Sequence, residues 1–227
     1  MSTSDTNLNP GMGVWQFFDD GNDDYDQDLL DRGRDASLVL EHIRRVQEHE
    51  LTLQAVVTLG EQTTEGQVIE AVCTAWFALV QAFVRNPQLM FDLDSRKWEE
   101  MIAGAYAAEG WEIVTLTPRS GDGGKDVIAT RRDFGSIRFI EQVKRYSPGN
   151  LVTFEEVTAM LGVLDLERNA SKGIITTTSD FAPGVYTNNR IAELRPSRLD
   201  LRPGLELLKW LSSIKSERTS KGSKGGA

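Results

Sequence analysis

Residues 121–129 read GDGGKDVIA, and residues 140–146 read IEQVKRY. The glycines allow a sharp backbone turn, and Asp126 then opens a short apolar run of the kind that forms a strand. Residues 140–146 lie at the end of another run of the kind that forms a strand. Because side chains alternate along a strand, Gln142 and Lys144 share one of its faces. The two stretches therefore predict neighbouring strands that bring Asp126, Gln142 and Lys144 to one point.

Such a point suits the hydrolysis of phosphodiester bonds. A divalent cation needs oxygen ligands, and it activates water and neutralises charge on the phosphate. Asp126 would supply a carboxylate, Gln142 an amide oxygen and Val143 a backbone carbonyl, while the Lys144 ammonium would stabilise developing charge. The expected cofactor is Mg²⁺ or Mn²⁺.

The sequence around these stretches predicts an α/β fold. A meander of three strands, a crossover helix and a further strand give a mixed central sheet flanked by helices. The expected helices are 95–108 with Ser95 as N-cap, 153–168, 182–194 and 205–214, and the expected strands are 111–116, 126–130, 137–146, 173–178 and 199–201.

Residues 1–94 differ in character from this region. Residues 1–35 form an acidic segment, with eight aspartates and two arginines between positions 19 and 35, and we expect a flexible leader. Residues 36–94 are predicted to be a helical N-terminal region.

Within that region, apolar spacing predicts helices over 36–53 and 65–84. Thr64 and Gln67 fit a capping box at the start of the second helix, and Pro87 follows its end. The Ser-, Lys- and Gly-rich tail 216–227 is expected to be disordered.

Net charge sets limits on function. The 227 residues carry −9 in total, distributed as −12 over residues 1–94, +1 over 95–215 and +2 over the tail. An enzyme that binds and releases DNA needs basic groups near the groove rather than a basic chain. The single cysteine, Cys73, excludes an internal disulfide and a cysteine-based zinc site.

Nothing in the sequence indicates a membrane span or a signal peptide. The longest uncharged stretch, 71–84, has 14 residues, whereas a span needs about 20. We expect a core helix there and a cytoplasmic protein.

The stretch from Trp98 to about Leu208 resembles the Mrr-like branch of the PD-(D/E)xK nuclease superfamily. The resemblance rests on the order and spacing of five pieces: residues 98–100 (WEE), 109–111 (EGW), 120–129, 142–146 (QVKRY) and 172–178 (KGIITTT). It implies a restriction-endonuclease-like domain over 95–215, with residues 36–94 as an N-terminal helical extension.

The resemblance also implies roles for individual residues. Asp126 is similar to the metal-binding aspartate and Lys144 to the catalytic lysine. Gln142 stands where most of the superfamily has an acid, as in the QxK variant. Glu99 resembles a first-helix glutamate that supplements the metal site, and Asp122 is a weaker supplementary candidate.

DNA contacts are expected from two sources. Thr178 and Ser179 follow from the resemblance, as phosphate contacts. Basic residues that could line a DNA groove are Arg119, Lys125, Arg145 and Arg190. Taken singly, each is also compatible with an ordinary solvated charge.

The expected function is endonucleolytic cleavage of DNA in restriction or defence, by a homodimer because cutting two strands needs two active sites. Two alternatives stay open. Since Gln142 removes one metal-binding charge, the domain could be a catalytically silent DNA-binding module. It could also be a nuclease effector, or toxin, activated by a partner or small ligand through the N-terminal region.

Overall fold

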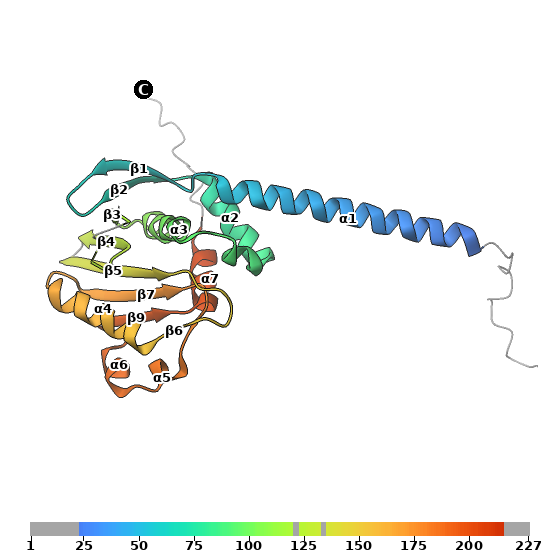
Figure 1. Cartoon of the computed structure of the whole chain (residues 1–227). Helices are drawn as coiled ribbons and strands as arrows, with labels where there is room; N and C mark the ends of the chain where they lie inside the picture. The colour runs from blue at the N-terminus through green and yellow to red at the C-terminus, as the bar shows by residue number, and fades with distance from the viewer. Residues whose placement is uncertain (1–22, 120–122, 133–134, 216–227) are drawn as a thin grey trace, which may run out of the picture. The chain divides into compact units, whose positions relative to one another are not determined.

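The computed structural model describes residues 23–119, 123–132 and 135–215 (Figure 1). The chain divides into two compact units, residues 1–46 and 47–227. In the described part, the first unit consists of the N-terminal portion of one long helix, α1 (Asp23–Leu53). The predicted tail and the first part of the predicted leader lie outside the described residues.

Helix α1 begins within the segment that we expected to be a flexible leader. Residues 23–35 are helical, and the flexibility of the leader stays a prediction. An acidic run opposes burial in a core, but it does not prevent the backbone from forming a helix. Negative charge near a helix N-terminus is in fact favourable.

A seven-stranded mixed sheet forms the centre of the second unit (Figure 1). In spatial order, the first five strands pair antiparallel with their neighbours, and the fifth, sixth and seventh strands pair parallel. This arrangement confirms the predicted mixed sheet. The strands in spatial order are β1 (Val57–Gln62), β2 (Gln67–Val72), β3 (Ile113–Leu116), β4 (Val127–Arg132), β5 (Ser136–Lys144), β7 (Lys172–Thr177) and β9 (Leu199–Arg202).

Strand β2 replaces the first part of the predicted helix 65–84, so the region 36–94, which we predicted to be helical, also contains the hairpin β1–β2. Gly66 turns the chain with φ at 144°, and a Cβ there would lie 2.2 Å from the carbonyl oxygen of Leu116. This close approach lets Gln67 pair with Leu116 across β2 and β3. Pairing with an existing strand thus outweighs the local capping signal.

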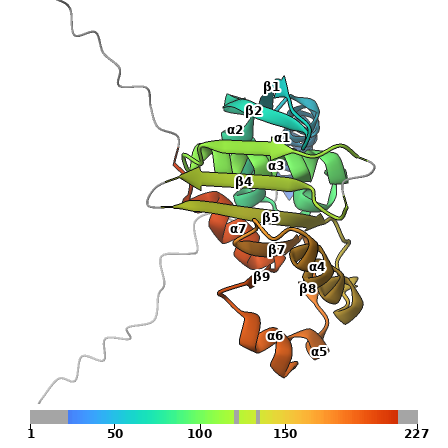
Figure 2. The ribbon, with the colours of Figure 1, turned by 90° about the vertical axis from the view of Figure 1, so that its left-hand side faces the viewer.

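Helices cover both faces of the sheet (Figure 2). One face carries α2 (Thr74–Arg85), α3 (Ser95–Ala108) and α7 (Gly204–Ser213), and the other carries α4 (Phe154–Leu166). The short elements are η1 (Pro87–Phe91), β6 (Leu151–Val152), β8 (Asp180–Phe181), α5 (Pro183–Tyr186) and α6 (Asn189–Leu194), of which β6 and β8 pair in parallel.

The core under α2 and α3 fixes the position of α3 on the sheet. Trp76 and Trp98 are fully buried, and their indole N–H groups donate to the carbonyls of Met101 and Met90, both at 2.9 Å. Trp98 also stacks on Phe83 at 5.3 Å between ring centres. A buried indole with a satisfied N–H has one preferred orientation, so α3 is held rigidly beside the strands.

Two predicted helix boundaries need correction. Asp94 rather than Ser95 caps α3, because its carboxylate accepts the backbone N–H of Lys97 at 2.8 Å. The helix predicted over 182–194 is two helices, α5 and α6, since the side chain of Asn188 caps a new start by accepting from Ile191 N.

Candidate active site

Asp126 lies immediately before β4, next to the end of β5. The pairing of the two strands reaches Val127 and Glu141 at this end. The backbone N–H of Asp126 donates to the carbonyl of Glu141 at 2.9 Å, and its Oδ2 accepts from the backbone N–H of Val143 at 2.6 Å. The carboxylate is therefore held beside Gln142 and Val143.

The face of β5 that carries Gln142 and Lys144 is the one covered by α4. Ile140, two residues earlier on that face, belongs to the α4 core. Lys144 reaches α4 itself, with Nζ 3.4 Å from the Oε1 of Glu156. Asp126 lies just before β4, and Gln142 and Lys144 lie near the end of the adjacent strand β5. The three residues are therefore at the same end of two neighbouring strands.

Glu141 lies on the other face of β5, fully buried. Its carboxylate accepts from the hydroxyls of Tyr106 and Thr176 and from the guanidinium of Arg202 at 3.1 Å. Burial and the negative charge of Glu141 raise the pKa of Tyr106 well above its usual value. This cluster joins α3, β5, β7 and β9, and it leaves Glu141 outside the candidate site, as its phase on the strand predicts.

The glycine-rich turn passes close to the amide of Gln142. Gly124 has φ at 81°, in the left-handed region, and a Cβ placed on it would lie 3.6 Å from the Nε2 of Gln142. Among the described residues, the Gln142 side chain makes no hydrogen bond, so its amide oxygen is available to a ligand.

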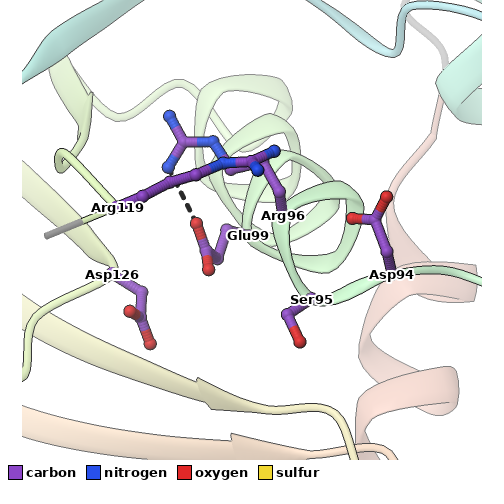
Figure 3. A pocket seen from close by; sticks show the side chains of 6 residues that line it. All are labelled: Asp94, Ser95, Arg96, Glu99, Arg119 and Asp126. Atoms are coloured by element: carbon purple, nitrogen blue, oxygen red, sulfur yellow. Dashed lines mark hydrogen bonds and ion pairs between the residues drawn. The ribbon is translucent and has the colours of Figure 1, made fainter.

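A pocket of about 440 Å³ opens between α3 and the start of β4 (Figure 3). Its lining residues are Asp94, Ser95, Arg96, Glu99, Arg119 and Asp126. Glu99 and Asp126 both belong to this lining, and Arg96 donates to Glu99 at 2.8 Å and to the carbonyl of Thr117 at 2.9 Å. The pocket therefore holds the two carboxylates expected near the metal together with Arg119. Gln142 and Lys144 are not part of this lining.

Lys144 belongs to a polar group built around Glu156. The carboxylate of Glu156 accepts from the Tyr146 hydroxyl and from the backbone N–H of Thr153 at 2.9 Å, completing a capping box at the start of α4. Partial burial opposes ionisation of Glu156, but these hydrogen bonds and the charge of Lys144 lower its pKa overall. An ionised Glu156 therefore sets the direction of the Lys144 ammonium.

Two of the predicted basic DNA contacts are engaged within the protein. Lys125 forms an ion pair with Glu167. Arg145 donates to the backbone carbonyls of Phe91 and Leu93, the latter at 3.1 Å. Of the four basic candidates, Arg119 is the one that lines the pocket with Asp126.

The remaining expected contacts lie elsewhere. Thr178 is buried, and its hydroxyl both accepts from and donates to the backbone of Tyr146 at 2.9 and 2.7 Å, so its position does not support a phosphate contact. Ser179 is half-buried, and its backbone N–H donates to Thr177. Arg190 is exposed on α6. Asp122 lies outside the described residues.

Three residues around the site were not identified from the sequence. Arg96 orients Glu99, whereas Glu156 and Tyr146 orient Lys144. A Glu three residues after Thr153 is a capping-box signal, and it could have located Glu156 at the start of α4. No sequence signal would have joined Glu156 to Lys144, because that contact depends on how α4 packs on β5.

The donor set fits a hard divalent cation. Asp126 and Glu99 offer carboxylate oxygens, Gln142 an amide oxygen and Val143 a carbonyl, and such oxygens are the ligands of Mg²⁺ and Mn²⁺. Within the described ranges there is no group of three or more His, Cys, Asp or Glu side chains that could hold a metal. A cation here would therefore rely on neutral ligands and water beside the carboxylates.

Comparison with known proteins assigns the class. The family model described as restriction endonuclease, Mrr_cat, matches residues 91–211. The chain belongs to this restriction endonuclease family, and the match includes both strands that carry the candidate site. The resemblance to the Mrr-like family that the motifs indicated is thereby confirmed.

Individual relatives are distant. An uncharacterized protein of Sinorhizobium fredii, y4cE, is 28% identical over 109 residues, which are 48% of this chain and 27% of that protein. The chain therefore spans about a quarter of the length of this curated relative.

Three solved structures are also similar, each with a TM-score of 0.40. The modification-dependent restriction endonuclease AspBHI shares 18% identity, with 70% of this chain and 39% of that chain covered. The restriction endonuclease MspJI, solved with a 27-mer oligonucleotide, shares 20%, covering 66% and 33%. AF1548, of unknown function, shares 17%, covering 58% and 73%.

None of the helices among the described residues combines the length and the apolar composition that crossing a membrane requires. The uncharged stretch 71–84 forms the end of β2 and most of α2, whose Trp76, Leu79 and Phe83 lie in the core. Cys73 is a free thiol.

Proposed function

We propose that the chain is a metal-dependent endonuclease that hydrolyses phosphodiester bonds of DNA, acting against foreign DNA in the cytoplasm. The observation that carries the proposal is the hydrogen bond between the Asp126 carboxylate and Val143 N at 2.6 Å. It joins Asp126, immediately before β4, to the end of β5 that carries Gln142 and Lys144. Membership of a restriction endonuclease family supports the same reaction.

In this proposal Asp126, Gln142, the Val143 carbonyl and Glu99 hold Mg²⁺ or Mn²⁺. When bound, the cation lowers the pKa of water and neutralises charge on the scissile phosphate. Arg96, which donates to Glu99 at 2.8 Å, keeps that carboxylate turned into the pocket.

Lys144 stabilises the charge that develops on the phosphate oxygens, a role for which a fixed ammonium is well suited. Glu156 holds the ammonium from behind at 3.4 Å. Arg119, which lines the pocket, contacts the DNA backbone. Lys125 and Arg145 contribute to DNA binding only if their side chains leave the contacts described above, whereas Ser179 and the exposed Arg190 stay candidate contacts.

Conversion of supercoiled plasmid to nicked and linear DNA tests the proposal. With Mg²⁺ or Mn²⁺ the wild-type chain should cut, and chelation should stop it. Asp126→Asn should abolish cutting, whereas Asp165→Asn, at an exposed aspartate on α4, should leave it unchanged. Lys144→Ala should also abolish cutting, whereas Lys209→Ala, at an exposed lysine on α7, should not.

The same assay addresses the silent DNA-binding alternative. Among the described residues, the site combines two carboxylates with a neutral amide, and this specific feature favours that alternative. Binding of duplex DNA without cutting, under every metal and on both plain and modified DNA, would establish it in place of the nuclease.

A further inference from the structure

Lys125, the residue before Asp126, forms an ion pair with Glu167 at the end of α4. The two side chains are 21% and 25% exposed, so the pair is largely shielded from water. Salt weakens such a pair less than it weakens a pair on the open surface. The pair therefore links the turn that leads into β4 to a helix on the other side of that turn.

The energetics of the helix itself do not explain a glutamate at position 167. This residue is the C-cap of α4, and the last turn of α4 contains no basic residue. Because the carboxyl end of a helix carries partial negative charge, a carboxylate there is unfavourable. The Lys125 ammonium offsets that cost. The contact, rather than the helix, thus accounts for a carboxylate at this position.

The turn that this pair holds packs between α4 and β5. A Cβ placed on Gly124 would lie 3.4 Å from the Cγ2 of Val163 and 3.6 Å from the Nε2 of Gln142. Residues four apart on a helix lie on the same side of it, so Val163 and Glu167 face the turn together. Helix α4 thus contacts two successive residues of the turn, one by packing and one by charge.

The backbone on either side of the bond between Lys125 and Asp126 is held from β3 as well. The buried Thr117 donates its hydroxyl to the carbonyls of both residues, the second at 3.1 Å. The Asp126 carboxylate then accepts from Val143 N at 2.6 Å. The backbone that presents this carboxylate to the end of β5 is therefore fixed by hydrogen bonds from β3 and by an ion pair from α4.

We propose that Glu167 is a positioning residue. Through Lys125 it holds the Asp126 carboxylate against the end of β5 and thereby sets the affinity of the site for a divalent cation. The inference rests on the proposed function, which gives that carboxylate its metal-binding role. It also gives Lys125 a role within the protein in place of a DNA contact. Helix α4 then orients the site from both ends, since Glu156 near its start pairs with Lys144.

Amide hydrogen exchange of Val143, measured without metal or DNA, tests the positioning step. Because this amide donates to the Asp126 carboxylate, it should exchange several times faster in Glu167→Gln than in the wild type. Asp165→Asn is the matched control, since it removes an exposed carboxylate from the last turn of the same helix. Unchanged exchange of Val143 in Glu167→Gln would overturn the inference.

The amides of β7 separate a local change from a loss of stability. Removing a carboxylate from the carboxyl end of a helix should not weaken the helix, so these amides should keep their wild-type exchange rates in Glu167→Gln. If they accelerate as much as Val143, the variant destabilises the whole fold and the positioning role fails.

The affinity for Mn²⁺ in the presence of a short DNA duplex tests the consequence, by a double-mutant cycle. Glu167→Gln should weaken Mn²⁺ binding about tenfold, as expected when a residue that orients a metal ligand is lost. In a Lys125→Met background the same substitution should have no further effect, because the ion pair is already absent. An equal loss in both backgrounds would show that Glu167 acts without Lys125 and would overturn the inference.

The outcomes distinguish this inference from the proposed function. A wild type that binds no Mn²⁺ contradicts the metal site, and the inference fails with it. A wild type that binds Mn²⁺ no more tightly than Glu167→Gln does contradicts the inference alone. Tighter DNA binding by Glu167→Gln, with unchanged exchange of Val143, would assign Lys125 to the DNA backbone instead.

Discussion

Val143 donates its backbone N–H to the carboxylate of Asp126 across 2.6 Å. A side chain thereby replaces a backbone partner at the point where β4 begins, and the carboxylate takes its orientation from β5. The same stretch of β5 carries Gln142 and Lys144 on the face toward α4. The pairing of β4 with β5 therefore brings the residues of the candidate site together. Residues that fix the positions of these side chains should affect activity.

Glu99 should act as the second carboxylate of the metal site. We expect Glu99→Gln to reduce cleavage about 10- to 100-fold and to raise the Mg²⁺ concentration needed for half-maximal rate. Glu100→Gln is the control, because Glu100 pairs with Lys97 and is absent from the pocket lining. Equal metal requirements for the two variants would contradict the role of Glu99.

Glu156 should act on the rate through Lys144. Glu156→Gln removes the carboxylate charge, while a Gln can still complete a capping box with Thr153. We expect kcat to fall about tenfold while DNA affinity and thermal stability change little. Glu155→Gln, one residue away and exposed, should behave as the wild type. A loss confined to DNA affinity would show that Glu156 does not position the lysine.

Tyr146 should make stability depend on alkaline pH. Partial burial and then the hydrogen bond to Glu156 raise the pKa of Tyr146 to about 12, whereas an unfolded tyrosine ionises near pH ~10. The folded state keeps a proton that the unfolded state loses, so this stability is present below pH ~10 and is lost as the pH rises toward about 12.

Chemical denaturation at about pH 9 and about pH 11 measures this effect. The free energy of unfolding of the wild type should fall more between the two values than that of Tyr146→Phe. The comparison with Tyr146→Phe separates Tyr146 from Tyr186, whose pKa is also raised by burial and by Asp180. Equal losses in the two proteins would exclude Tyr146 as their source.

Arg202 should stabilise the fold because it compensates a buried charge. Glu141 is fully buried and bonds Arg202 at 3.1 Å, and the guanidinium also stacks 3.8 Å from the ring of Trp210. Arg202→Met should lower the free energy of unfolding by about 3 kcal/mol. Adding Glu141→Gln should restore part of this loss. Arg168→Met, at an exposed position, is the control, and a similar small change in both variants would refute this role.

The central strands could be predicted because their signals are local. Glycines 123 and 124 and Asp126 come directly before β4, residues 140–144 end the next strand in the chain, and the register of β4 with β5 follows from the hairpin that these two strands form. Helix α4 likewise begins at Phe154, one residue after the predicted start at residue 153, because a capping box forms at Thr153. In each case, neighbouring residues contain the physical cause of the structure.

The missed features depend on contacts between distant segments. Residues 67–72 have helix-compatible spacing, and they form a strand because they pair with β1 and with the distant strand β3. Arg145 was expected in the DNA groove, yet the carbonyls of Phe91 and Leu93 hold its guanidinium. Strand β3, Phe91 and Leu93 are all distant in sequence from the segments that they contact, so propensity and periodicity contain no signal for these contacts.

Binding of Mn²⁺ to the full chain, followed by the loss of the paramagnetic resonance signal of free Mn²⁺, tests most directly whether Asp126 and the end of β5 hold a cation. The wild type and Asp165→Asn should bind Mn²⁺ equally in the presence of a short DNA duplex, and Asp126→Asn should leave the free signal unchanged. Equal binding by Asp126→Asn and the wild type, or no binding by the wild type, would contradict the assignment of the site.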